Sequence, residues 1–394
     1  TAMAIMRLLP QPPARIAGCD HLAALAGQLG QPAPSIDSGH VLLEAEGFRL
    51  KWERHNEFSS YCFFRRIEPD DSPDDYALLH VPAAWRKAIP GLLIAATHIE
   101  LRDVGEMPLE TVLHQQSRHG QALVASGVSD GAGWVLTDFH LHDGFSHFLL
   151  LDKGFTPRQA GRIAQRLVEI ETYRVMALLA FPVAKDTGRL VSRAEDELAD
   201  LMDGMGQSRS AEDDRAVLAR LSRLAAEVER SVARTTFRFG AAGAYYRLVR
   251  QRIDDLREDR LPGFSPIGEF MDRRLVPAID TCTSIARRQD DLSGRIARNS
   301  QLLRTRVDIE IERQNQELLA QMNRRAKIQL HLQETVEGLS VVAITYYASQ
   351  LVNYVSKGAK HLIEPLTPEV LTAVSIPVIA GVVYMGLRRM RKLL

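Results

Sequence analysis

Five side chains of the types that bind metal ions lie close together in the stretch TDFHLHDGFSHF, namely Asp138, His140, His142, Asp143 and His147. Asp138, His140 and His142 alternate with other residues, so on a β-strand they project from one face. This spacing can hold a metal ion when a further ligand comes from a nearby segment, and His147 is within reach for that role. The alternative is that the Asp/His face is solvated or pairs with basic side chains of a neighbouring strand. The sequence leaves both interpretations open.

A second alternating set consists of Glu53, His55 and Glu57, on a strand expected to neighbour the first. We interpret it as cross-strand pairing with arginine or histidine. The sequence contains no glycine-rich phosphate loop, nucleophile elbow, metalloprotease helix or kinase-like set. The segment Gly240-Ala-Ala-Gly243 has no lysine and follows no expected strand, so we interpret it as a helix break or a close contact between helices. We therefore expect no enzymatic activity and no cofactor.

Charge and composition exclude several classes of protein. The 394 residues carry 49 basic and 49 acidic side chains, so no net positive field favours nucleic acid. A hydrophobic content of 45% can form a core in at least one folding unit. Cys19, Cys62 and Cys282 lie far apart without metal or redox spacing, which favours a reducing compartment. The N-terminal apolar run has no basic region before it, so we do not interpret it as a signal peptide.

Alternating patterns and turn residues predict an α+β fold. Between His40 and about Lys153 they predict a largely antiparallel sheet. The expected strands are HVLLEAE, FRLKWERH, FSSYCFFRR, LLIAATHIEL, QALVASGVS, GWVLTDFHLH and FSHFLLLD. Thr156 followed by Pro157 predicts a helix N-terminus, and helical spacing continues to Glu337. We divide the chain into a sheet-rich part at 1–155, a helical part at 156–265, a long stalk helix at 266–337 and two transmembrane helices at 338–394.

A long helix is expected to follow shorter ones at about 187–205, 211–236 and 241–260. Its apolar residues recur at sevens and fours, close to an eleven-residue repeat that a nearly straight helix sustains. They are Ile285, Leu292, Ile296, Leu303, Val307, Ile311, Leu318 and Met322. This stripe must be covered by other helices for much of its length. A helical hairpin within one subunit and a stalk between subunits both satisfy that need, and the second predicts a homo-oligomer.

Two apolar segments lie near the C-terminus, at Gly338–Val355 and Val370–Leu387. Both are uncharged and at the short end of the length that spans a bilayer; a soluble hairpin with an apolar tip is the alternative. Basic residues flank the pair on its outer sides, so the positive-inside rule predicts a membrane protein with both termini in the cytoplasm. The side chains expected to contact lipid headgroups are Arg324, Arg325, Lys327, Arg388 and Arg389.

The first of these segments, GLSVVAITYYASQLVNYV, also carries a polar stripe. On a helix, one face together with its continuation contains Tyr346, Ser349, Gln350, Asn353 and Lys357. Lipid penalises such a face because buried amides need hydrogen-bond partners. The stripe should therefore meet another helix, copies of itself, or water. Contacts that hold helices together and the wall of a pore remain alternatives.

Long blocks of this sequence resemble a bacterial family of unknown function, described as uncharacterized membrane-anchored proteins. The blocks extend over nearly the whole chain and include FRLKWERHNEFSSYCFF, TDFHLHDGFSHFLLLDKGFTPRQAGR, EIETYRVMALL and SQLLRTRVDIEIERQNQELLAQMNRRAKIQLHLQETVEGLSVVAITYY. The last third also resembles the CorA-type divalent-cation channels in architecture. That resemblance implies a ring of subunits, a pentamer in the usual case, with the first span lining the axis. The sequence departs from the family motif Gly-Met-Asn, because Asn353-Tyr354-Val355 stands at that end of the segment.

These observations predict an oligomeric membrane protein of CorA-like build that conducts ions along a polar path. The alternative is a membrane-anchored scaffold or regulatory protein whose cytosolic domain binds a partner or ligand. The missing selectivity motif favours this alternative. A ring of Lys357 side chains at the mouth would also repel cations. The expected partners are membrane lipid and further copies of the chain, with no nucleic acid.

Overall fold

A computed structural model describes most of the chain and divides it into two compact units. The residues described are 2–8, 13–35, 37–67, 76–105, 108, 111, 123–207, 211–358 and 368–391. Unit 1 contains 1–209 and 216–300, and unit 2 contains 210–215 and 301–394. The parts predicted at 1–155 and 156–265 therefore lie almost entirely in unit 1.

Unit 1 contains a sheet of nine strands among the described residues, in the order β2-β3-β4-β1-β5-β8-β7-β6-β9. The strands are β1 Ala2–Leu8, β2 His40–Ala45, β3 Phe48–Arg54, β4 Phe58–Phe64, β5 Leu92–Asp103, β6 Val124–Val128, β7 Gly133–His142, β8 Phe145–Asp152 and β9 Asp259–Arg260. Adjacent strands are antiparallel except β5 and β8, which are parallel. The predicted antiparallel-rich sheet is confirmed. The sequence did not predict β1, which pairs with β4 and β5 in the middle of the order.

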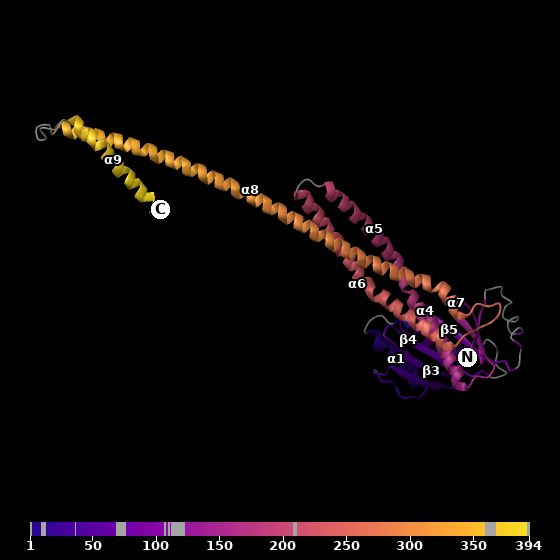
Figure 1. Cartoon of the computed structure of the whole chain (residues 1–394). Coiled ribbons are helices and arrows are strands. Elements are labelled where there is room, and N and C mark those ends of the chain that lie inside the picture. The colour runs from indigo at the N-terminus through magenta and orange to yellow at the C-terminus, as the bar shows by residue number, and fades with distance from the viewer. Residues whose placement is uncertain are drawn as a thin grey trace. The chain divides into compact units, whose positions relative to one another are not determined.

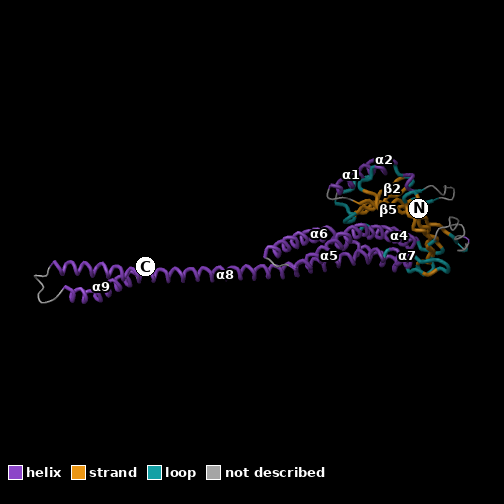
Figure 2. The backbone as a smooth tube through the Cα atoms, turned by 90° about the horizontal axis from the view of Figure 1, so that it is seen from above, coloured by secondary structure: helices purple, strands orange, loops and turns teal. Residues whose placement is uncertain are grey.

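Helices cover both faces of this sheet (Figure 1). The helical elements are α1 Pro13–Gln28, η1 Ala77–His80, α2 Ala83–Lys87, α4 Pro157–Leu178, α5 Ala180–Gln207, α6 Ala211–Leu256, α7 Ile267–Arg274, α8 Val276–Gly358 and α9 Pro368–Arg391. Figure 2 shows α1 and α2 on one side of the sheet and α4 on the other. Helix α4 begins where the sequence predicts, because Thr156 and Gln159 form a reciprocal capping box ahead of Pro157.

The two faces of the sheet carry separate hydrophobic cores. On one face Leu22 and Leu25 of α1 belong to a cluster with Trp52, Tyr61 and Phe63, and all five are at most 1% exposed. On the other face α4 packs against β5 and β8 through a second cluster that contains Ile99, Phe148, Leu150, Ile163 and Leu167. The alternation of side chains along each strand sends neighbouring residues into different cores.

Helices α6 and α8 are each longer than the sequence suggested. Helix α6 continues through Gly240-Ala-Ala-Gly243, so the interpretation of this segment as a helix break is wrong. Ala242 is 1% exposed and lies in the core, whereas a Cβ atom added at Gly240 would meet open space. Helix α8 joins the predicted stalk and the first apolar segment into 83 helical residues.

The apolar stripe of α8 changes its exposure along the helix. Ile285, Leu292 and Ile296 in unit 1 are buried, as are Leu303 and Val307 in unit 2. Further along unit 2 the same spacing continues with exposed side chains, which include Ile311, Leu318 and Met322. Helices of the same chain therefore cover only the first part of the predicted stripe.

One helix in the described part of the chain is long and apolar enough to cross a membrane. Its apolar segment, Glu369–Gly386, covers 18 residues of α9, and none of that segment is buried. Gly338–Val355 is helical but does not meet the same condition, because its hydroxyl and amide side chains lower its hydropathy. The prediction of two spans is therefore corrected to one candidate, by length and composition. The sequence predicts a polar loop between the two segments, SKGAKHLIEPLTPE at 356–369, of which 359–367 lie outside the described residues.

Candidate functional site

Strand β7 contains a bulge within the predicted metal cluster. Its pairing with β8 shifts register between Thr137 and Leu141, and Phe139 has a φ of 53°. The Phe139 ring stacks on Phe270, with the ring centroids 4.4 Å apart, and so packs against the core. A bulge ends the strict alternation of side chains. The predicted arrangement of three metal-binding side chains on one face is therefore broken.

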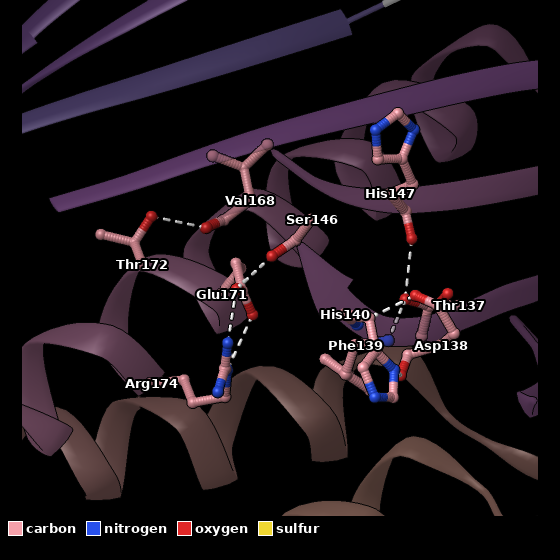
Figure 3. Close-up of polar contacts among 10 residues, drawn as sticks. All are labelled: Thr137, Asp138, Phe139, His140, Ser146, His147, Val168, Glu171, Thr172 and Arg174. Atoms are coloured by element: carbon pink, nitrogen blue, oxygen red, sulfur yellow. Dashed lines mark hydrogen bonds and ion pairs between the residues drawn. The ribbon is translucent and has the colours of Figure 1, made fainter. Parts of the chain in front are cut away.

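The predicted metal ligands go to different partners. His142 Nε2 lies 2.6 Å from Asp138 Oδ2, whereas His140 Nδ1 lies 2.8 Å from the main-chain oxygen of Asp138. The His147 ring on β8 points away from His140 (Figure 3), and its Nδ1 lies 3.3 Å from Nδ1 of His98. Among the described residues, no group of three or more His, Cys, Asp or Glu side chains is placed to hold a metal ion. The geometry does not form the predicted metal site.

His98 is a buried titratable group that the sequence did not single out. It lies on β5, is 3% exposed, and meets the Tyr76 ring edge-on with centroids 4.3 Å apart. Burial lowers the pKa of His98 to about 4, and the charge of His147 acts in the same direction. Burial also lowers the pKa of His147. The two imidazoles meet only through the parallel pairing of β5 with β8, a contact that no sequence spacing reveals.

A buried ion pair within α4 is hydrogen-bonded to β8 on the opposite face of the sheet (Figure 3). Glu171 is 1% exposed and accepts hydrogen bonds from Arg174 Nε at 2.8 Å and Nη2 at 2.6 Å. Ser146 Oγ donates to the same carboxylate at 2.6 Å. Burial alone would lower the pKa of Arg174, but the adjacent Glu171 charge raises it overall. This network satisfies the buried carboxylate with a charged partner and a hydroxyl donor.

A cavity of about 480 Å³ lies between this face of the sheet and α4. Its sheet side includes alternate residues of β4, namely Phe58, Ser60, Cys62 and Phe64. Its helix side includes side chains spread along α4 from Arg158 to Tyr173. The volume, and the combination of apolar surface with a few polar groups, are typical of small-molecule sites.

The acidic groups of the cavity are already paired within the protein. Glu53 Oε1 lies 3.0 Å from Lys51 Nζ on the same strand. Glu169 forms an ion pair with Arg252 of α6 and accepts a hydrogen bond from Gln165 Nε2 at 2.8 Å. These contacts neutralise both carboxylates, because each has a basic side chain within bonding distance.

Two arginines at the mouth of the cavity have no such partner. Arg158 and Arg162 lie one helical turn apart on α4, and both are exposed. In the part of the chain that the structure describes, neither guanidinium forms an ion pair or a hydrogen bond to another residue. Gly161 lines the cavity beside them, and a Cβ atom added there would meet open space. The mouth is therefore positive, and the interior is mainly apolar.

Burial favours the neutral forms of three titratable groups of the cavity, Cys62, His55 and Tyr173. Burial raises the pKa of the Cys62 thiol to about 11. Burial lowers the pKa of His55, whose ring stacks on Phe58 with centroids 4.3 Å apart. Burial and the charge of Glu169 raise the pKa of Tyr173. A protonated thiol is a poor nucleophile, so these groups suit binding better than covalent catalysis.

The structure separates the side chains of the second alternating set, Glu53, His55 and Glu57, between two places. Glu53 and His55 line the cavity, whereas Glu57 reaches α6, where it lies 2.9 Å from Arg238 Nη1 and accepts from Tyr245 OH at 2.8 Å. The pairing that we expected across strands takes place within β3 and with a helix instead. Strand β3 is also not a neighbour of β7, because four strands lie between them.

The residues of the polar stripe near the end of α8 differ in exposure. Ser349 is buried and donates to the Tyr346 main-chain oxygen at 2.8 Å, while the side chain of Tyr346 is 57% exposed. Gln350 and Asn353 are half-buried and Lys357 is exposed. Helix α9 turns back towards α8 within unit 2 (Figures 1 and 2). Arg388 belongs to α9, and the predicted headgroup-binding side chains of Arg324, Arg325, Lys327 and Arg389 are exposed.

A family model described as a protein of unknown function (DUF3422) matches residues 3–394. The chain belongs to the DUF3422 family. The match confirms the expected membership of an uncharacterized family, and it lends no support to the resemblance to CorA-type channels. No curated protein matches the chain. Because the DUF3422 match covers almost the entire sequence, the cavity and helix α9 both lie within the family's region.

Sequence reasoning missed most of the cavity. It singled out Glu53 and His55 but not Arg158, Gly161 or Arg162. The available signal was the spacing of the two arginines, which places them on one helical face with a glycine between them. What the sequence could not show is that α4 crosses the sheet so that this face meets β4.

Proposed function

We propose that this protein is a membrane-anchored regulatory protein whose sheet domain binds a small ligand. The observation that supports the proposal is the cavity between β4 and α4, about 480 Å³ in volume, with its acids paired and its thiol protonated. Such a lining offers contacts and no activated nucleophile, so binding is the function that this geometry favours.

Helix α9 is the proposed anchor in the bacterial inner membrane. Its segment Glu369–Gly386 is long and apolar enough to span, and Arg389 beyond it is exposed. Basic residues at this end fit a cytoplasmic C-terminus. The exposed apolar side chains of α8, which include Leu318 and Met322, support a homo-oligomer, because a second copy could cover them.

Filling the cavity tests the binding function. Gly161→Leu should abolish calorimetric binding of naphthalene-2-sulfonamide, a neutral apolar probe, to the full chain in lipid nanodiscs. Gly240→Leu is the matched control, because Gly240 is also an exposed helical glycine with open space around its Cβ position but does not line the cavity. Binding to the wild type and to Gly240→Leu, at least tenfold above Gly161→Leu, supports the proposal. Equal binding by all three would refute it.

Charges placed in α9 test the anchor. Val374→Arg combined with Val378→Arg should move the chain from the carbonate-washed membrane fraction to the soluble fraction, since each arginine at a span's centre costs about 3 kcal/mol. Val336→Arg, at an exposed position of α8, is the control and should leave the distribution unchanged. Retention of the double variant in the membrane fraction would contradict this role of α9.

A second candidate function is ion conduction by a ring of CorA-like build. The observation that favours it is the pair Gln350 and Asn353, whose half-buried amides make no side-chain hydrogen bond within the described residues. In a ring these amides would line the axis. Replacing both by leucine should then abolish cation flux into proteoliposomes, whereas Leu351→Ala, at an exposed position outside the stripe, should preserve it. Unchanged flux in the leucine variant, or no flux in the wild type, would rule out this candidate.

A further inference from the structure

We infer that the ligand of the cavity is a small amphipathic acid, whose anionic head lies between Arg158 and Arg162 and whose apolar body enters the space above β4. The inference rests on the proposed binding function and adds the chemical class of the ligand. Three observations carry it: the composition of the interior, the charges at the mouth, and the open space at Gly161 beside the two arginines.

The interior selects an apolar body. Phe58 and Phe64, at the two ends of β4, face the cavity together with Ala164 and Val168 of α4. Binding becomes more favourable when the apolar surface of a ligand is removed from water and packs against aromatic and aliphatic side chains. The polar groups between the two rings, Ser60 and a protonated Cys62, are neutral. A charged head has no partner of opposite sign at this depth.

The mouth selects an anion. Lys51 is paired with Glu53, which leaves the two arginines as the unpaired charges among the described side chains of the lining. Guanidinium groups bind planar carboxylates and tetrahedral acids through paired, charge-assisted hydrogen bonds. Arg158 also lies in the first turn of α4, where the helix dipole favours negative charge. Both the guanidinium groups and the helix dipole therefore stabilise an acid bound at this position.

Open space beside the arginines admits the ligand. Gly161 lies next to Arg158 and Arg162 on α4 and presents no side chain, with nothing within 4 Å of its Cβ position. A bound acid could therefore reach both guanidinium groups while its body passes over the helix backbone into the cavity. One helical turn further along α4, Arg166 does not line the cavity. Its Nε atom lies 3.7 Å from Oδ2 of Asp255.

A pair of probes that differ in charge tests this class of ligand. Naphthalene-2-sulfonate and naphthalene-2-sulfonamide have nearly the same shape, and only the first is an anion. With the full chain in nanodiscs, the sulfonate should bind more tightly than the sulfonamide. Arg158→Gln and Arg162→Gln should each weaken the sulfonate about tenfold and leave the sulfonamide unchanged. Arg166→Gln is the matched control and should change neither.

The outcomes separate this inference from the proposed function. If both probes bind equally and the glutamine variants change neither, the anionic head is refuted while the binding cavity stands. If neither probe binds more tightly to the wild type than to Gly161→Leu, the binding function itself fails.

Titrations with decanoate and 2-naphthoate then identify the source of the acid. Tighter binding of decanoate indicates a lipid-derived acyl chain, and tighter binding of 2-naphthoate indicates a soluble aromatic acid; loss of both in Arg158→Gln supports the shared head.

Discussion

The two faces of strands β3 and β4 carry different kinds of side chain, although the residues of both faces alternate along the same two strands. Trp52, Tyr61 and Phe63 point to the α1 side, where each is at most 1% exposed. Their neighbours Lys51, Glu53, Ser60 and Cys62 point to the α4 side and line a cavity. Register places Lys51 opposite Cys62 and Glu53 opposite Ser60, so the polar residues are gathered in one patch.

This difference shows how one pair of strands can both stabilise the fold and present a site. The closed face removes large apolar side chains from water, which contributes most to the free energy of folding. The open face keeps polar side chains that contribute little to stability and are free to contact a ligand. Substitutions on the two faces should therefore differ in their effects on stability.

Adjacent residues of β4 offer the most direct test of this comparison. Phe63→Ala should lower the free energy of unfolding by ~3–5 kcal/mol, because it opens a cavity in a close-packed core. Cys62→Ala, one residue away on the open face, should cost less than about 1 kcal/mol. Urea unfolding followed by fluorescence measures both. Similar losses for the two variants would show that the open face is as tightly packed as the closed one.

The buried ion pair of Glu171 with Arg174 refines the comparison. It is polar and lies on the α4 side of the sheet, but it is buried and does not line the cavity. Glu171→Gln should cost about 3 kcal/mol, because Arg174 keeps its charge and loses the charged partner. The exposed pair of Glu197 with Arg220, at 3.6 Å, provides the control. Glu197→Gln should cost less than about 1 kcal/mol in the same urea titration. A small loss for Glu171→Gln would mean that water reaches Arg174.

A pH titration examines the closed face through His98. Its pKa is lowered from 6.5 to about 4, so between these values the unfolded chain binds a proton that the folded chain does not. Stability therefore rises with pH across this window, at up to about 1.4 kcal/mol per pH unit. His98→Leu should reduce that slope, whereas His331→Leu, at a solvent-exposed side chain, should not. An unchanged slope in His98→Leu would contradict the burial of this imidazole.

The smallest expected effect concerns the cavity itself. Gly161→Ala should raise the free energy of unfolding by about 0.5–1 kcal/mol, because alanine restricts the unfolded chain and nothing in the folded state obstructs its Cβ. Gly240→Ala should give a similar gain at a helical site outside the cavity. Thermal unfolding measures both. A loss of stability only in Gly161→Ala would show that the space beside it is filled.

Local patterns determined most of the secondary structure. Alternation in FRLKWERH and FSSYCFFRR predicted β3 and β4, and Thr156 with Pro157 located the start of α4. These features depend on neighbours within a few residues, which the sequence displays directly. The α+β fold and the long helix were accessible for the same reason.

Three errors came from contacts between distant segments. The bulge at Phe139 depends on a stacking partner in α7, and it disrupted a regular Asp/His spacing. The pairing of β5 with β8 brought His98 to His147, although neither pattern pointed to the other. Strand β1 was recognisable only by the two strands that it joins.

The sequence by itself determined which side chains could meet a ligand, because alternation in β4 and helical spacing in α4 fix the face on which each residue lies. Only the tertiary structure decided that these two faces confront each other, since the crossing of α4 over the sheet depends on apolar packing against β5 and β8. That packing also pairs the acids of the cavity and leaves Arg158 and Arg162 unpaired at its mouth.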